Sequence, residues 1–188
     1  KNLEDFSKIL TKMDCLVVGP GLGDKADDFI LAAWNSDIPM VLDADGLRWL
    51  GRVKPSNRRQ KWIGTPHPGE AKFLLNNEIG NRFTAVKRLK SKFGGEWVLK
   101  GPGTLVTYEN SIYVNPFADG ILATAGSGDI LAGIIGGLIA QKMPQAALVG
   151  VWLHSESARL LLKDGEVRIL ASGLLDKFSE AIVRLDYC

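Results

Sequence analysis

Short apolar runs alternate with helix-like segments along most of this chain. The apolar runs are bounded by turn residues and occupy 15–19, 39–43, 62–64 and 97–100. Runs of this length and composition are typical of strands that are buried on both faces. Helical segments fit between them, at 27–34, 45–50, 68–75 and 81–92. The alternation predicts an α/β fold with a mostly parallel sheet, in which ligands gather at the carboxyl ends of the strands.

The pattern changes after residue 100. Two β-rich segments, 104–108 and 111–114, flank a two-residue turn and predict an antiparallel hairpin near one edge of the sheet. Three helices should follow, the first of them apolar almost all round and therefore buried, at 127–141, 145–163 and 171–184. Because 188 residues suffice for one sizeable core, we expect 1–188 to form a single domain. Its architecture should be a three-layer sandwich with helices on both faces of the sheet.

Composition and charge exclude several classes of protein. The 23 basic and 21 acidic side chains leave a net charge of +2 without a long run of either sign, so no nucleic-acid partner is expected. Cys15 and Cys188 match neither a disulfide framework nor a metal-ligand spacing. The apolar run at 130–140 is too short to cross a bilayer, and 1–10 lacks the apolar core of a secretion signal. We therefore expect a cytoplasmic protein without a membrane partner. The tryptophans are scattered along the sequence, which favours packing over a platform for stacking bases.

A glycine-rich turn opens the apolar helix at 127–141. Gly126, Ser127 and Gly128 leave backbone N–H groups free at the positive end of the helix dipole, an arrangement that favours phosphate. Asp129 follows in the first helical turn. A carboxylate beside an anion is unfavourable unless it accepts a proton or meets a cation, so Asp129 is a candidate base for a hydroxyl that is being phosphorylated. A structural alternative, in which Ser127 or Asp129 only caps the helix, stays open.

Two further glycine-rich loops follow predicted strands. The segment 19–23, Gly-Pro-Gly-Leu-Gly, allows close approach of a ligand to the backbone, or it is an ordinary strand-to-helix turn. The segment 100–104 places Lys100 before Gly-Pro-Gly-Thr, so that an ammonium group and backbone N–H donors can meet a phosphate. The alternative for this second loop is a solvated lysine.

Acidic residues and histidines supply the remaining candidates. In the segment Thr-Pro-His-Pro-Gly-Glu, His67 and Glu70 suit either the start of a helix or contacts to substrate hydroxyls and to water around a metal. Asp43 and Asp45 offer a pair of carboxylates at the end of a strand, with the alternative that Asp45 only caps a helix. His154 has no evident partner, which favours a core or surface histidine over a ligand.

In this order and spacing, the segments resemble the NAD(P)H-hydrate dehydratase family, the carbohydrate-kinase-like enzymes of the ribokinase-like superfamily. The resemblance covers nearly all of the chain and is carried by Gly-Pro-Gly-Leu-Gly, Asp-Ala-Asp-Gly-Leu, Thr-Pro-His-Pro-Gly-Glu, Leu-Lys-Gly-Pro-Gly-Thr and Gly-Ser-Gly-Asp. It implies a ribokinase-like fold and the repair of NADH or NADPH whose nicotinamide ring has been hydrated, with ADP or ATP and Mg²⁺ driving removal of the water. The form Thr-Pro-His-Pro-Gly-Glu is similar to that of the bacterial branch, which uses ADP rather than ATP.

The resemblance also implies a set of site residues. The nucleotide would contact Lys100, Gly101, Pro102, Gly103, Thr104, Gly126, Ser127 and Gly128. The hydrated dinucleotide, a small-molecule substrate, would contact Gly21, Gly23, His67 and Asp129. Asp129 would be the catalytic base, and Glu70 would orient hydrated Mg²⁺ through water. A homo-oligomer is the expected assembly.

The chain departs from the family pattern in two ways. The family carries a further N-terminal segment, so we expect part of the fold to be missing here. Near the anion turn, Ala125 stands where glycine is usual, and 119–122 replaces the usual Asn-Pro-Gly. A methyl group at a position that requires positive φ costs about 1 kcal/mol. Two other functions stay open: a small-molecule kinase of the same superfamily acting on a vitamin precursor or sugar-like alcohol, and a non-catalytic nucleotide-binding fragment.

Overall fold

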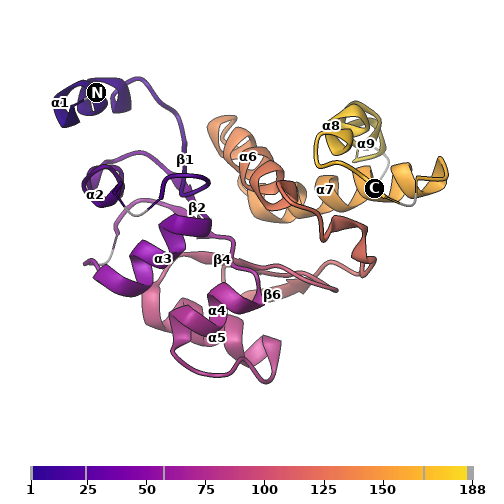
Figure 1. The fold of residues 1–188 in the computed structure, drawn as a ribbon, viewed down its shortest axis with the longest axis horizontal. Coiled ribbons are helices and arrows are strands. Elements are labelled where there is room, and N and C mark those ends of the chain that lie inside the picture. Colours follow the sequence, from indigo (N-terminus) through magenta and orange to yellow (C-terminus); the bar gives the residue numbers. More distant parts are fainter. Residues whose placement is uncertain (1, 24, 57, 167, 186–188) are drawn as a thin grey trace.

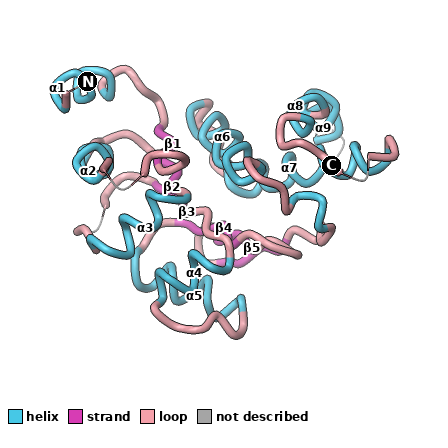
Figure 2. The backbone as a smooth tube through the Cα atoms, viewed as in Figure 1, coloured by secondary structure: helices cyan, strands magenta, loops and turns pink. Residues whose placement is uncertain are grey.

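The fold is built on one six-stranded sheet (Figures 1 and 2). The computed structural model describes residues 2–23, 25–56, 58–166 and 168–185. The strands lie side by side in chain order as β1 (Leu16–Val18), β2 (Met40–Leu42), β3 (Trp62–Gly64), β4 (Glu96–Leu99), β5 (Leu105–Tyr108) and β6 (Ser111–Val114). The first four run parallel, whereas β5 pairs antiparallel with both β4 and β6. The predicted mostly parallel sheet, with an antiparallel hairpin at one edge, is confirmed.

Helices cover both faces of this sheet. In Figure 1, α2 to α5 lie on one side of it and α6 and α7 lie on the other, while α8 and α9 pack against α7 and α1 packs against α2. The helices are α1 (Leu3–Leu10), α2 (Asp27–Asn35), α3 (Ala44–Val53), α4 (Pro68–Leu75), α5 (Arg82–Phe93), α6 (Ser127–Ala140), α7 (Ala146–Lys163), α8 (Gly173–Asp176) and α9 (Phe178–Leu185), with a 3-10 turn at Gly120–Leu122. In the described part of the chain, no helix has both the length and the apolar character that crossing a bilayer requires.

The alternation of side chains along each strand explains the three layers. Met40 and Leu42 belong to a hydrophobic cluster formed with α2 to α5, whereas Val41 between them belongs to a second cluster formed with α6 and α7. In the same way, Leu99 and Val98 of β4 face opposite clusters. Because both faces of these strands are buried, the sequence shows continuous apolar runs instead of alternating apolar and polar residues.

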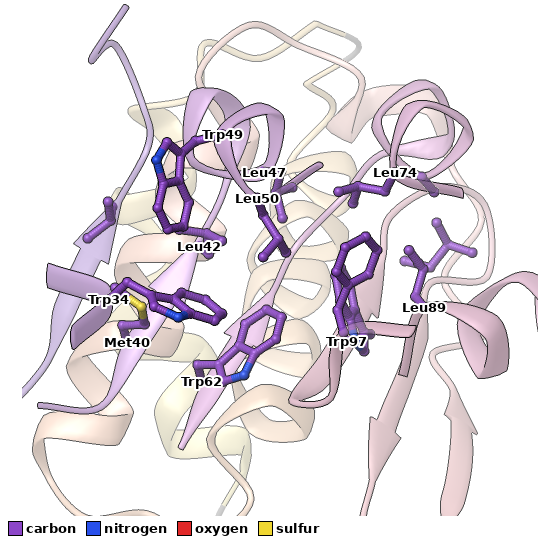
Figure 3. Close-up of a cluster of buried hydrophobic side chains, with 14 of the residues drawn as sticks. Trp34, Met40, Leu42, Leu47, Trp49, Leu50, Trp62, Leu74, Leu89 and Trp97 are labelled. Carbon is purple, nitrogen blue, oxygen red and sulfur yellow. The ribbon is translucent and has the colours of Figure 1, made fainter. Parts of the chain in front are cut away.

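Four tryptophans meet in the cluster beneath α2 to α5 (Figure 3). The ring centroid of Trp34 lies 5.7 Å from that of Trp49 and 5.1 Å from that of Trp62. The ring centroids of Trp62 and Trp97 are 5.3 Å apart. Gly64 makes room for this contact, because a Cβ at that position would lie 2.7 Å from the Trp97 ring. The prediction that the tryptophans serve packing is confirmed for these four, which form one aromatic cluster although they are scattered in the sequence.

The predicted helix at 171–184 is wrong as a single element. The chain forms α8 and α9 instead, separated at Lys177, whose ammonium group pairs with Asp164 just beyond α7. Leu174 of α8 packs in one small hydrophobic cluster and Ala181 of α9 packs in another. Two short helices therefore cover two separate patches along α7. The structure also adds α1 and the 3-10 turn, which the sequence pattern did not predict.

Candidate functional site

A pocket of about 490 Å³ opens at the carboxyl ends of the parallel strands. The segments after β2, β3 and β4 meet there with the first turn of α6 and the middle of α7. Loops that are far apart in the sequence thus come together, as expected at this edge of an α/β sheet. The polar and charged residues on the pocket wall are Asp43, His67, Glu70, Lys100, Thr104, Asp119, Thr124, Ser127, Asp129, His154 and Ser155.

The turn before α6 has the geometry of an anion site. Gly126 is the N-cap of α6 and has a φ of 83°, a left-handed conformation that glycine adopts without strain. The Ser127 N–H donates to the Thr124 carbonyl at 3.2 Å, whereas helix geometry leaves the N–H groups of Gly128 and Asp129 without an intrahelical acceptor. Among the described residues no side chain caps this helix, so the alternative in which Ser127 or Asp129 is only a cap is wrong. Asp129 is exposed and borders the pocket.

Lys100 lies between two carboxylates of the pocket wall. Its Nζ is 2.9 Å from Asp43 Oδ1 and 4.0 Å from Glu70 Oε2. The Asp43 side chain is 2% exposed, so Lys100 replaces the water that would otherwise solvate its charge. A Cβ at Gly128 would lie 3.1 Å from Lys100 Nζ. The absence of a side chain there lets the ammonium group reach the first turn of α6, where an anion would bind.

His67 and Glu70 form a reciprocal capping box at the start of α4. His67 Nδ1 accepts the N–H groups of Gly69 and Glu70 at 3.0 and 3.2 Å, and Glu70 Oε2 accepts the His67 N–H at 2.8 Å. Because Nδ1 accepts, the proton of the neutral imidazole lies on Nε2, 3.6 Å from Glu70 Oε1. The helix-start interpretation is confirmed for both residues. Both residues also line the pocket, so the capping role does not remove them from its wall.

The loop at 100–104 follows β4 and forms another part of the wall. Gly101 and Gly103 have φ angles of 130° and 62°, which favour glycine, and Thr104 Oγ1 donates to the Gly101 carbonyl at 3.0 Å. On the other side of this loop, the guanidinium of Arg82 from α5 donates to its carbonyl oxygens. No local sequence pattern indicates a role for Arg82, because its partners lie 17 to 21 residues away.

His154 is buried in α7 directly behind the anion turn. Its Nε2 lies 3.0 Å from both the carbonyl oxygen and Oγ of Ser127. A carbonyl oxygen can only accept, so Nε2 carries the ring proton. Burial lowers the pKa of His154 to about 4, which keeps the imidazole neutral near pH 7. Of the core and surface positions that the sequence left open, the structure shows the core. The contact with Ser127, 27 residues away, left no local pattern in the sequence.

The first glycine-rich turn packs against the start of α3. A Cβ at Gly19 would lie 1.7 Å from the Asp43 carbonyl oxygen, so only glycine fits there. The Gly23 N–H donates to Asp45 Oδ2 at 2.9 Å. The interpretation of Asp45 as a helix cap is wrong, because Asp43 occupies the N-cap position of α3. Among the described residues, the pocket wall includes neither Gly21 nor Gly23, so their contact with a substrate stays a prediction.

The unusual residues near the anion turn are accommodated without strain. Ala125 is not among the described residues with positive φ, so the penalty of about 1 kcal/mol does not apply. Asp119 Oδ1 accepts the Ile121 N–H at 2.9 Å and caps the 3-10 turn, which borders the pocket through Gly120 and Leu122.

The donor groups of the pocket suit a metal that arrives with its own ligands. Within the described ranges, no three His, Cys, Asp or Glu residues come together as a ligand set. The carboxylates of Glu70 and Asp129 are hard oxygen donors, which match Mg²⁺ held mainly by water and nucleotide phosphates. Of the two cysteines, Cys188 lies outside the described residues, and burial raises the pKa of Cys15 to about 11 and keeps it a thiol.

The sheet and its two helical layers form a ribokinase-like fold. Over 97% of its length the chain superposes on a ribokinase-like superfamily protein from Enterococcus faecalis, with a TM-score of 0.87, 22% identity and 67% of that chain covered. Residues 1–180 match the NAD(P)H-hydrate dehydratase family, and the chain belongs to that family. The ribokinase-like fold implied by the sequence is therefore confirmed.

Relatives with curated names agree with this assignment. The chain is 45% identical to the bifunctional NAD(P)H-hydrate repair enzyme of Coxiella burnetii, over 91% of this chain and 37% of the relative. It is 41% identical to the ADP-dependent (S)-NAD(P)H-hydrate dehydratase of Neisseria meningitidis, over 85% of this chain and 58% of that protein. The chain is also similar to the ADP/ATP-dependent NAD(P)H-hydrate dehydratase from Bacillus subtilis, whose crystal was grown with ATP and Mg²⁺. The match covers 91% of this chain and 66% of the Bacillus chain, with a TM-score of 0.82 and 27% identity. The chain thus spans between about a third and two thirds of these relatives.

Proposed function

We propose that this chain binds ADP or ATP in the pocket and uses it to remove water from hydrated NADH or NADPH. The proposal rests mainly on one observation: three groups lie at the same pocket, namely exposed Asp129, the free N–H groups of the α6 turn and the Lys100 ammonium group. The names of the relatives supply the reaction, since they describe NAD(P)H-hydrate dehydratases that depend on ADP or on ADP and ATP.

In the proposed reaction, Asp129 accepts the proton of the ring hydroxyl while the terminal phosphoryl group of the nucleotide passes to the hydroxyl oxygen. The N–H groups of Gly128 and Asp129, together with Lys100, stabilise the charge on that phosphoryl group. Phosphate then leaves with the former hydroxyl oxygen, and loss of a proton from the neighbouring ring carbon restores the dihydropyridine. The nucleotide ends one phosphate shorter, and the atoms of the removed water leave in the phosphate and the two protons.

The remaining pocket residues hold the two substrates. The loop at 100–104 and the turn at 126–128 would hold the nucleotide, while His67 Nε2–H would donate to the hydrated dinucleotide. Glu70 would hold Mg²⁺ through water, and the metal would supply positive charge next to the phosphates. Gly21 and Gly23 remain assigned to the dinucleotide, through the turn that Asp45 fixes.

Three finer features belong to the same proposal. We expect ADP to be preferred over ATP, in line with the name of the Neisseria relative and with the form of the segment around His67. A homo-oligomeric assembly and a cytoplasmic location are also expected. Measuring the size of the purified protein tests the homo-oligomeric assembly. Fractionation of cells tests the cytoplasmic location.

The test is the recovery of dihydronicotinamide absorbance after hydrated NADH is mixed with the chain and either ADP or ATP. We expect recovery with both nucleotides and faster recovery with ADP. Replacing Asp129 with asparagine should slow turnover at least about a hundredfold, because a positioned base contributes that much or more. The matched control is Asp28→Asn, an exposed carboxylate in the first turn of α2, which should leave turnover unchanged.

Two results would contradict the proposal. Accumulation of a stable phosphorylated product without recovery of NADH would identify a small-molecule kinase. Tight ADP binding without any turnover would identify a non-catalytic nucleotide-binding fragment. Near-normal turnover of the Asp129→Asn variant would reject Asp129 as the base even if the reaction itself is observed.

A further inference from the structure

Arg82 occupies a position that helix electrostatics alone does not favour. It is the first residue of α5, next to the N-cap Asn81, and the first turn of this helix contains no acidic residue. A cation at the positive end of a helix is unfavourable unless other groups neutralise it. The contacts of Arg82 with the loop at 100–104 supply the compensation.

The guanidinium of Arg82 holds four carbonyl groups of one short stretch of backbone. Its Nη2 donates to the carbonyl oxygens of Leu99 and Lys100 at 3.0 and 3.2 Å. Its Nη1 donates to that of Gly103 at 3.1 Å and to that of Pro102. The planar guanidinium is a fork of several donors in fixed directions, and this fork suits contacts with four carbonyl groups, whereas the single ammonium group of lysine does not.

These four contacts decide which way the N–H groups of the loop point. The carbonyl of one residue shares its peptide unit with the N–H of the next residue, and in a trans peptide these two groups point in opposite directions. The described residues contain no cis peptide. Two of the four N–H groups have acceptors, since Lys100 N–H donates to Pro66 and Gly103 N–H donates to Phe117. The other two belong to Gly101 and Thr104. Both residues line the pocket, and trans geometry turns their N–H groups away from the Arg82 guanidinium.

The charge of Arg82 is not cancelled by an acidic partner. Across residues 2–23, 25–56, 58–166 and 168–185, no carboxylate forms an ion pair with it, and its buried Nε has no hydrogen-bond partner. Burial lowers the pKa of this guanidinium, yet arginine stays charged in proteins. A positive charge therefore lies next to a loop in which, among the described residues, the N–H groups of Gly101 and Thr104 have no backbone acceptor, an arrangement that favours an anion.

We propose that Arg82 is a positioning residue for the nucleotide, which sets the loop at 100–104 so that the N–H groups of Gly101 and Thr104 face the pocket. This inference rests on the proposed function, since it takes a nucleoside diphosphate as the ligand of that loop. Arg82 itself touches the backbone of the loop and acts through it.

The experiment compares Arg82→Met, which removes the fork, with Arg82→Lys, which keeps the charge. The matched control is Arg88→Met, an exposed arginine on the same helix. Calorimetry measures the Kd of ADP with Mg²⁺, and kinetics measure KM for ADP and for hydrated NADH separately. Thermal unfolding and amide hydrogen exchange at 101–104 show whether each variant is folded and whether the loop has loosened.

We expect both Arg82 variants to weaken ADP binding about tenfold or more and to raise the KM for ADP, because charged hydrogen bonds that order the loop are lost. The KM for hydrated NADH should change less than twofold, and Arg88→Met should match the unchanged chain. Equal losses for both substrates would indicate general destabilisation and overturn the proposal. An ADP Kd within twofold of normal in Arg82→Met would overturn it too, as would a lack of ADP binding by the unchanged chain.

Failure of the proposed role of Arg82 and failure of the proposed reaction give different experimental results. If the unchanged chain binds ADP but does not restore NADH, the proposed reaction fails, while the role of Arg82 is still decided by the Kd values. If NADH is restored normally and the Arg82 variants bind ADP normally, the proposed reaction stands and the role of Arg82 is rejected.

Discussion

The Asp43–Lys100 pair is the clearest test of energetics at the scale of single residues. Asp43 and Lys100 side chains are 2% and 19% exposed, and removing one partner of a buried pair leaves an unpaired charge that costs about 3 kcal/mol or more. We expect Lys100→Met to lower the free energy of unfolding by about this amount in urea. The double variant with Asp43→Asn should lose less than Lys100→Met alone, because no carboxylate is then left without a partner.

A matched control for this pair is Arg52→Met, which breaks the exposed Arg52–Asp27 pair and should cost about 1 kcal/mol at most. If the losses of Asp43→Asn and Lys100→Met simply add in the double variant, the two side chains do not depend on each other, and the pair has no special energetic role.

The buried imidazole of His154 should make stability depend on pH. Its pKa is about 4 in the folded chain and about 6.5 when unfolded, so the unfolded state binds more protons between these values. Stability should therefore be complete above pH 6.5 and fall as the pH is lowered toward 4, by about 3 kcal/mol in all. Urea denaturation at several pH values measures this loss. In His154→Gln the loss over that interval should shrink by most of this amount, and an unchanged slope would reject the burial of a neutral imidazole.

Residues of the pocket that lie in local motifs can be predicted from the sequence, whereas their distant partners cannot. Lys100, His67, Glu70 and Asp129 were identified because each lies in a local motif next to a predicted strand end or helix start, and the structure brings all four to one pocket. The partners of Lys100 and Ser127 were not identified, because Asp43 lies 57 residues before the former and His154 lies 27 after the latter. Such contacts depend on tertiary packing and produce no recognisable spacing of residues in the sequence.

At the scale of elements, the junction of β1 with α3 gives a sharp contrast between two glycines. Gly19 has a φ of 130° and a Cβ there would lie 1.7 Å from the Asp43 carbonyl, whereas Gly21 has a φ of 67° and open space around it. We expect Gly21→Ala to cost about 1 kcal/mol, the usual penalty of a left-handed conformation. Gly19→Ala should cost several times more, because the end of β1 must move away from α3.

Urea unfolding of both glycine variants measures these costs, and far-UV circular dichroism shows whether each variant still folds. Because both variants add the same methyl group to the same turn, the comparison isolates the close approach at Gly19. Similar costs for the two would show that β1 and α3 are not held as closely as the geometry indicates.

The elements themselves were predictable where one local cause fixes them. The helix at 68–75 was predicted to the residue, since Pro68 and the capping box of His67 and Glu70 fix its start. The segment at 171–184 was not, because its division into α8 and α9 follows from two separate patches on α7 rather than from its own sequence. Continuous apolar runs likewise predicted buried strands but could not show which face each side chain occupies.

At the scale of the whole molecule, the pocket joins the two helical layers. The loop at 100–104 and the start of α4 belong to the side of α2 to α5, and the anion turn belongs to α6 on the other side. β2, β3 and β4 are buried by both layers, so loosening one layer exposes the strands that support the other. We therefore expect the molecule to unfold in one cooperative step that ADP shifts as a whole.

This expectation is measurable with two probes of the same sample. Four of the five tryptophans lie in the aromatic cluster beneath α2 to α5, so tryptophan emission reports mainly on that layer. The fifth, Trp152, lies in α7, and far-UV circular dichroism reports on all the helices, including α6 and α7. ADP with Mg²⁺ at 100 times its Kd should raise the free energy of unfolding by about 2.7 kcal/mol in both signals, because ligand binding stabilises only the folded state. In Arg82→Met the same ADP concentration should give a smaller shift. A shift confined to one signal would mean that the layers unfold separately and that the pocket does not hold them together.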